Sequence, residues 1–135
     1  MTEILLAIDD DETRVERQIR TILDLPIRTE TVSVTVLHVF SDNPTGASVS
    51  QLQTARSVEE RLEAAGIDIN LDERSGDPAP EILAYADEID ADVLCLAGRK
   101  RSPTGKALFG SVTQDVLLST DRSVLIAGGA KTDGA

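Results

Sequence analysis

The sequence predicts an α/β domain in which a five-stranded parallel sheet carries helices on both faces. Segments typical of strands and of helices alternate five times along the 135 residues, which is the pattern of successive β-α-β units. The first strand, residues 4–8, is apolar throughout, as expected of a strand covered on both faces. We assign one domain to residues 1–129 and a short polar tail to residues 130–135.

The first strand leads into a helix whose start and end are both marked in the sequence. Asp11 is placed to cap this helix, and Pro26 stops it. Its apolar face carries Val15, Ile19 and Ile22. Residues 32–40 follow as the second strand, because they are rich in β-branched side chains.

The second helix follows a polar loop. Ser50 and Gln53 have the spacing of a capping box, and Gly66 is expected to end the helix. Its apolar positions, three and four residues apart, are Leu52, Ala55, Val58, Leu62 and Ala65. Residues 67–72 then alternate between apolar and polar side chains, so one face of this third strand contacts water. The alternation predicts a strand at an edge of the sheet.

The third helix begins at Asp77-Pro78, since proline is favoured at the first helical position. Its inner face carries Ile82, Tyr85, Ala86 and Ile89. Residues 93–97 form the fourth strand, and Ser111 with Gln114 has the spacing of a second capping box, for the last helix. The apolar face of that helix carries Val112, Val116 and Leu117.

The charge balance argues against two classes of partner. The chain carries 24 acidic against 13 basic residues, a net charge of −11, so nucleic acids and anionic membrane surfaces would repel it. No apolar run approaches the length of a membrane span, and we expect a soluble cytoplasmic protein. Many carboxylates, few lysines and 2% aromatic residues favour a halophilic chain, in which salt screens the surface repulsion.

A cluster of cations lies between the fourth strand and the last helix. Arg99, Lys100, Arg101 and Lys106 fall in a stretch without any acidic residue, shortly before Gly110 and the start of the helix. Backbone amides and the helix dipole favour an anion at such a helix start. The stretch does not have the spacing of a Walker loop. It predicts a phosphate-bearing small molecule as ligand, with a solvated turn or a partner contact as the alternative.

Four segments resemble the universal stress protein family in its small single-domain form. They are Asp9 at the end of the first strand, Leu37-His38-Val39, Gly110-Ser111-Val112-Thr113 and Ser123-Val124-Leu125-Ile126. The resemblance implies the strand order 3-2-1-4-5 in a flavodoxin-like or Rossmann-like fold, of the adenine nucleotide alpha-hydrolase kind. It also implies a homodimer and a bound adenine nucleotide, ATP or AMP, with Mg²⁺ as a candidate companion. The composition points to a haloarchaeal member.

The resemblance implies a set of nucleotide-binding residues. Asp9 would reach the nucleotide by hydrogen bonds, and Val39 would flank the adenine. The hydroxyls of Ser111 and Thr113 would donate to phosphate oxygens beside the Val112 amide. The full set is Asp9, Val39, Ala97, Gly98, Lys100, Gly110, Ser111, Val112 and Thr113.

Departures from the family pattern leave an alternative function open. Ala97 and Lys100 stand where nucleotide-binding members carry glycines, although the lysine brings a charge that can reach a phosphate. Asp10 and Asp11 replace a Gly-Ser pair and would repel a polyphosphate unless a divalent cation intervened. The alternative is an interaction protein of the same fold that binds no nucleotide, in which Ser111 only caps its helix.

A receiver-like phosphotransfer domain is the second alternative, because receivers also place acids after the first strand to hold Mg²⁺. It would need Asp72 as the phosphate acceptor and Lys131 as the lysine after the fifth strand. We predict no catalytic residue, at most slow ATP hydrolysis, and no metal site. His38 is expected to be a packed or hydrogen-bonded structural residue, and Cys95 an inert buried thiol.

The fifth strand, residues 123–127, predicts a dimer contact. Its residues Val124, Leu125, Ile126 and Ala127 are apolar without a break, yet the implied strand order places them at the outer edge of the sheet. An exposed apolar edge favours pairing with another chain. We therefore expect a homodimer in which two copies of this strand lie side by side.

Overall fold

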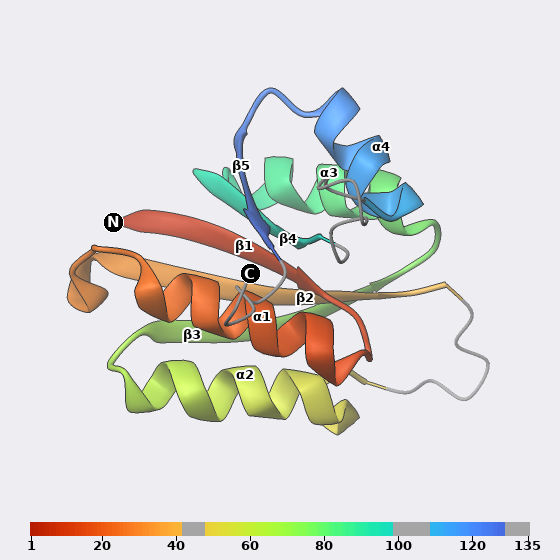
Figure 1. Cartoon of the computed structure of the whole chain (residues 1–135). Helices are drawn as coiled ribbons and strands as arrows, with labels where there is room; N and C mark the ends of the chain where they lie inside the picture. Colours follow the sequence, from red (N-terminus) through yellow and green to blue (C-terminus); the bar gives the residue numbers. More distant parts are fainter. Residues whose placement is uncertain (42–47, 99–108, 129–135) are drawn as a thin grey trace, which may run out of the picture.

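The computed structural model describes residues 1–41, 48–98 and 109–128, and these form three layers with a sheet between two pairs of helices (Figure 1). Five parallel strands have the order β3-β2-β1-β4-β5, which confirms the implied order. The strands are β1 (Thr2–Ile8), β2 (Val32–Phe40), β3 (Asp68–Ser75), β4 (Val93–Ala97) and β5 (Ser123–Ala127). The helices are α1 (Glu12–Asp24), α2 (Gln53–Ala64), α3 (Pro78–Ile89) and α4 (Ser111–Ser119), with short 3-10 turns η1 (Thr29–Thr31) and η2 (Val49–Gln51).

Helices α1 and α2 cover one face of the sheet, and α3 and α4 cover the other (Figure 1). Because successive residues of a strand point to opposite faces, the core divides into two clusters. One cluster joins α1 and α2 to Leu6 and Val36, and the other joins α3 and α4 to Leu5 and Leu37. Leu5 and Leu6 are both fully buried, which confirms that the apolar first strand is covered on both sides.

The strand order reverses between β1 and β4. Leu6 of β1 pairs with Val36 of β2 on one side and with Cys95 of β4 on the other. Ligand sites of open α/β sheets lie beyond the carboxyl ends of the strands at such a reversal. Asp9 follows the end of β1, and Ala97 is the last residue of β4. The fold therefore brings these two predicted site residues to the edge where a ligand is expected.

The predicted capping box of the second helix is wrong. The observed box lies earlier, where Ser48 and Gln51 enclose η2 and the Ser48 amide donates to the Gln51 side chain at 3.0 Å. Helix α2 follows with Leu52 as its N-cap and no side-chain cap, so Ser50 and Gln53 do not pair as predicted. The capping box therefore belongs to the 3-10 turn η2, which precedes α2, and not to α2 itself.

The predicted capping box of the last helix is also wrong. Gly110 is the N-cap of α4, with the extended backbone that this position requires, and no side chain of the described residues caps the helix. Ser111 is already the first helical residue, so its hydroxyl is not placed to accept from amides one turn ahead. The Gln114 amide donates to the Gly110 carbonyl at 3.0 Å. The helix therefore starts with uncapped amides.

Other predicted boundaries are confirmed. Asp11 caps α1 by accepting from the Arg14 amide at 2.9 Å, and α1 ends at Asp24, before Pro26. Gly66 follows α2 with φ of 83°, a left-handed backbone that favours glycine. Strand β3 is an edge strand as predicted, but it continues to Ser75 because it pairs with β2 as far as Phe40.

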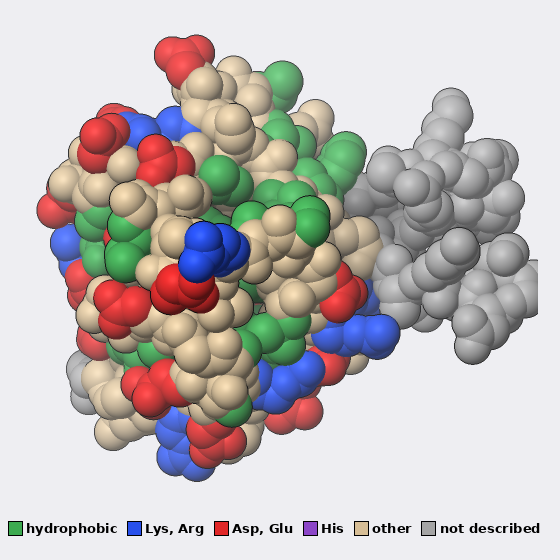
Figure 2. All heavy atoms as spheres, turned by 90° about the vertical axis from the view of Figure 1, so that its left-hand side faces the viewer, with side chains coloured by type: hydrophobic (Ala, Val, Ile, Leu, Met, Phe, Trp, Pro, Cys, Tyr) green, Lys and Arg blue, Asp and Glu red, His purple; other side chains and the backbone are tan. Residues whose placement is uncertain are grey.

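The surface mixes charges of both signs. Figure 2 views the molecule from the left of Figure 1 and shows acidic and basic side chains among small apolar patches. Arg122 bonds Asp87 and Asp90 at the end of α3, and Arg61 of α2 bonds Glu16 of α1. Over the described ranges, no helix is long and apolar enough to cross a membrane.

Candidate functional site

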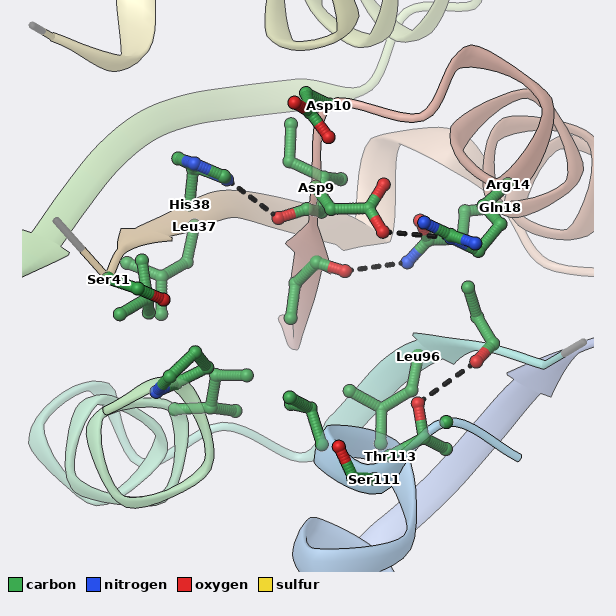
Figure 3. A pocket seen from close by; sticks show the side chains of 18 of the residues that line it. Asp9, Asp10, Arg14, Gln18, Leu37, His38, Ser41, Leu96, Ser111 and Thr113 are labelled. Carbon is green, nitrogen blue, oxygen red and sulfur yellow. Dashed lines mark hydrogen bonds and ion pairs between the residues drawn. The ribbon is translucent and has the colours of Figure 1, made fainter. Parts of the chain in front are cut away.

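A pocket of about 490 Å³ lies at the carboxyl ends of the strands where their order reverses (Figure 3). Its walls come from the ends of β1, β2 and β4, from the first two turns of α1 and α3, and from the first turn of α4. Of the predicted site residues, seven line it: Asp9, Val39, Ala97, Gly110, Ser111, Val112 and Thr113. Segments far apart in the sequence thus meet around one cavity.

The start of α4 forms the wall that suits an anion. Gly110 is its N-cap, and among the described residues no side chain caps the amides of Ser111, Val112 and Thr113. The first amides of a helix lack intrahelical acceptors, and the dipole makes this end positive. All four of these residues line the pocket. An anionic group in the cavity can therefore accept hydrogen bonds from them.

Thr113 has a structural role that its predicted role did not include. Its side chain is buried, and its hydroxyl donates to the Ala97 carbonyl at 3.0 Å (Figure 3). The bond ties the first turn of α4 to the end of β4. The hydroxyl hydrogen is thus used within the protein, so Thr113 offers the pocket its backbone amide.

Asp9 is held in one orientation on the opposite side of the pocket. One carboxylate oxygen accepts from the Asp11 amide at 2.9 Å, and the other accepts from Arg14 Nε at 2.8 Å. The Asp9 carbonyl accepts from the Thr54 hydroxyl at 2.7 Å, which fixes the backbone from the α2 side. Asp9 therefore presents a fixed acceptor group at the rim of the cavity.

Helix α1 contributes two polar residues that the sequence analysis did not assign to the site. Arg14 and Gln18 both line the pocket. Gln18 is 1% exposed, and its amide donates to the carbonyls of Ala7 at 2.8 Å and Cys95 at 3.3 Å. It joins the backbones of β1 and β4 near the point where these strands separate. A glutamine on the apolar face of a helix is the signal that identifies such a position.

Of the two remaining predicted site residues, Gly98 and Lys100, the structure places only the first. Gly98 does not line the pocket: its amide donates to the Ala127 carbonyl at 3.0 Å, and its carbonyl accepts from Arg17 at 3.4 Å. A Cβ at this position would lie 3.0 Å from Ile126 Cγ2, so the glycine permits close packing against β5. Lys100 lies outside the described residues, as do the other cations of its loop.

His38 and Cys95 have the structural roles predicted for them. His38 Nδ1 is 2.9 Å from the Ile8 carbonyl, and its ring meets Phe40 edge-on at 4.4 Å between centroids. Cys95 is fully buried, and burial raises the pKa of its thiol to about 12. In the parts of the chain that the structure describes, no three His, Cys, Asp or Glu residues gather to hold a metal ion.

The strand order and the position of Asp72 differ from those of a receiver domain. Receiver domains place the third strand beside the first, whereas here β1 lies between β2 and β4. Asp72 lies in the edge strand β3, where it accepts from the Tyr85 hydroxyl at 2.7 Å and pairs with Arg74. It does not line the pocket. Lys131 lies outside the described residues.

Comparison with known proteins decides the family. Residues 1–128 match the family model described as "Universal stress protein family". The chain belongs to the universal stress protein family.

Among relatives, a universal stress protein of Mycolicibacterium smegmatis is 38% identical over 69 residues, or 50% of this chain and 53% of that protein. The stress response protein NhaX of Bacillus subtilis is 36% identical over 59 residues, or 44% of this chain and 36% of that protein. The matched segments thus span about half and about a third of the length of these relatives.

Solved universal stress proteins share the fold over nearly the whole chain. A structure from Archaeoglobus fulgidus is 27% identical, with a TM-score of 0.72 over 93% of this chain and 98% of the other. A second, from Archaeoglobus fulgidus in complex with dAMP, is 22% identical, with a TM-score of 0.70 over 93% and 97%. A family member from Arabidopsis thaliana with AMP bound is 13% identical, with a TM-score of 0.72 over 97% and 93%.

Within this universal stress protein, the acids that follow the first strand have separate roles. Asp11 caps α1 by accepting a hydrogen bond from the Arg14 amide. This bond lowers the pKa of the Asp11 carboxyl group. Asp10 is exposed and lines the pocket. The helix cap predicted for Asp11 is therefore confirmed. Asp10 instead adds negative charge to the pocket rim.

Proposed function

We propose that this universal stress protein binds an adenine nucleotide in the pocket and acts as a regulatory module of the stress response. The observation that carries the proposal is the start of α4, which no described side chain caps and which faces a cavity of about 490 Å³ at the reversal of strand order. Relatives of the same fold have been crystallised with dAMP and with AMP. The proposed role is binding, with slow ATP hydrolysis at most.

The chemistry of the pocket changes from one side to the other. Val39, Pro78 and Ile82 line the side formed by β2 and α3, where the flat face of a base can pack against apolar groups. The amides of α4 lie on the side where a phosphate would accept hydrogen bonds. An amphipathic ligand with an aromatic base and a phosphate matches both sides.

Substitution of Gly110 tests this proposal. We expect Gly110→Asp to abolish AMP and ATP binding, because the carboxylate would accept from the α4 amides that a phosphate needs. Aspartate is also a favoured N-cap residue, so the variant should keep its thermal stability. Gly110→Ala is the matched control, since it adds a side chain without a charge.

Isothermal titration calorimetry with AMP, and with ATP with and without Mg²⁺, supplies the measurement. Asp9 and Asp10 lie at the pocket rim, so Mg²⁺ should strengthen ATP binding more than AMP binding by reducing repulsion of the triphosphate. Unchanged affinity in Gly110→Asp would place the ligand elsewhere. Absence of binding to the wild-type chain would favour the interaction protein that binds no nucleotide.

We propose in addition that the protein forms a homodimer through β5. This strand pairs only with β4 among the described strands, and Val124, Leu125 and Ile126 along it stay partly exposed. Sedimentation velocity should show a dimer that Leu125→Asp dissociates. Leu118→Asp is the control, because Leu118 is 79% exposed on α4. A monomeric wild-type chain at micromolar concentration would contradict the proposal.

A further inference from the structure

We propose that Arg14 binds the phosphate of the ligand and makes the pocket select nucleotides over nucleosides. The inference rests on the proposed function, since it concerns the same pocket. Arg14 follows the Asp11 cap in the first turn of α1 and lines the cavity. Its amide donates to Asp11 Oδ1 at 2.9 Å, so the backbone from which the side chain extends is fixed.

The acids among the described residues use only part of the Arg14 guanidinium. Its Nε donates to Asp9 Oδ2 at 2.8 Å, and its Nη2 lies 3.7 Å from Asp11 Oδ2. Nε and Nη2 together carry three of the five N–H groups of a guanidinium. The side chain is 37% exposed, so it keeps donors for a second acceptor inside the pocket.

The position of Arg14 suits an anion held by α4. Figure 3 shows Asp9 and Arg14 on one side of the cavity, with Ser111 and Thr113 on the other. A phosphate placed against the α4 amides would meet the guanidinium across the cavity. Arginine suits this contact because its planar fork can donate two parallel hydrogen bonds to a phosphate.

The charges of the described lining residues favour a cation at this point. Within the described lining of the pocket, Asp9 and Asp10 are negative and Arg14 is the cation. Two carboxylates without a nearby positive charge would repel a phosphate. Arg14 neutralises Asp9 through the ion pair. It thus lowers the repulsion and supplies a direct donor.

A purely structural role makes a different prediction. If Arg14 only orients Asp9, its loss should weaken every ligand that contacts Asp9, whether or not the ligand carries a phosphate. If Arg14 also binds the phosphate, its loss should weaken AMP more than adenosine, because only AMP loses the contact to the guanidinium. The ratio of the two affinities therefore separates the two roles.

The test is titration of the full chain and its Arg14→Gln variant with AMP and with adenosine. We expect the AMP affinity to fall about tenfold or more, as for loss of a hydrogen bond to a charged group, and the adenosine affinity to fall clearly less. Arg20→Gln is the matched control, because Arg20 is exposed on the same helix and does not line the pocket. Arg14→Lys keeps the charge without the fork and should lose less affinity for AMP.

The outcomes distinguish this inference from the proposed function. Equal losses for AMP and adenosine, or no loss for either, would overturn the role of Arg14 while nucleotide binding stands. Absence of AMP binding to the wild-type chain would overturn both. If Arg14→Gln proves unstable by circular dichroism, Arg14→Lys decides the question through the same AMP-to-adenosine ratio.

Discussion

The Thr113 hydroxyl shows how one hydrogen bond changes the interpretation of a site residue. It donates to the carbonyl of Ala97 at 3.0 Å, and Thr113 is buried. A phosphate ligand would then contact the Thr113 amide, which the helix start leaves open. The side chain acts by holding α4 against β4.

Thr113→Val should therefore separate stability from binding. Loss of the hydroxyl leaves the Ala97 carbonyl without this donor, which should lower the free energy of unfolding by about 1–2 kcal/mol. AMP affinity should stay close to that of the wild type, because the amide remains. Urea unfolding and calorimetry measure the two effects, with Thr113→Ser as control. A large loss of AMP affinity with wild-type stability would instead mean that the Thr113 hydroxyl donates to the phosphate.

Asp72 should make stability depend on acid pH. Partial burial alone would raise the pKa of Asp72, but bonds from Tyr85, the Glu73 amide and Arg74 outweigh it and lower the pKa below 3.8. A lowered pKa in the folded state stabilises the fold above the unfolded value, and this contribution is lost as pH falls below about 3.8. As the pH falls from about 5 to about 2, the urea midpoint of Asp72→Asn should therefore decrease less steeply than that of the wild type.

Asp68→Asn provides the matched control for this dependence. Asp68 begins the same strand and is exposed, so its substitution removes one carboxylate without disturbing the bond to Tyr85. The Asp68 variant should follow the wild-type curve. Identical slopes for Asp72→Asn and the wild type would show that Asp72 contributes no acid sensitivity.

At the scale of elements, the starts of α1 and α4 should respond differently to substitution of Asp11 and Ser111. Asp11 accepts from the Arg14 amide, so Asp11→Ala should cost about 1 kcal/mol. Ser111 lies inside its helix as the first residue, so Ser111→Ala should change the free energy of unfolding little. Urea unfolding of both variants gives the comparison. A larger cost for Ser111→Ala would mean that the Ser111 hydroxyl makes a stabilising hydrogen bond, as the predicted capping box assumed.

The elements differ in how far their boundaries could be predicted. Strand β2 occupies the predicted residues 32–40, because a β-branched run between turn signals leaves little choice. Strand β3 extends beyond the predicted residues 67–72, since its last residues are set by pairing with β2 rather than by alternation. Both predicted capping boxes are wrong, because a Ser-x-x-Gln spacing does not determine which residue leaves the helical conformation.

The site could be predicted in part for a related reason. Residues that directly follow strands, such as Asp9, are brought together by topology alone. Arg14 and Gln18 belong to a helix, and their position depends on how α1 rotates against the sheet. That rotation is fixed by packing of Val15 and Ile19, which places Gln18 beneath the strands and Arg14 at the cavity.

At the scale of the whole molecule, the net charge of −11 should make stability depend on salt. Like charges on a compact surface repel one another, and ions screen this repulsion. We expect Tm to rise as KCl increases from about 0.1 M to about 2 M. Scanning calorimetry measures it, with a neutral osmolyte at matched osmolality as control. A flat or falling Tm would argue against adaptation to a high-salt cytoplasm.

The burial of Cys95 has a practical consequence for such experiments. It is the one cysteine of the sequence, and with a thiol pKa of about 12 it stays protonated at neutral pH, out of reach of alkylating dyes. Ser41 is exposed at the mouth of the pocket. The thiol of a Ser41→Cys variant would therefore react with such a dye while Cys95 does not. A fluorophore attached there could report occupancy of the cavity in real time while the native cysteine stays in place.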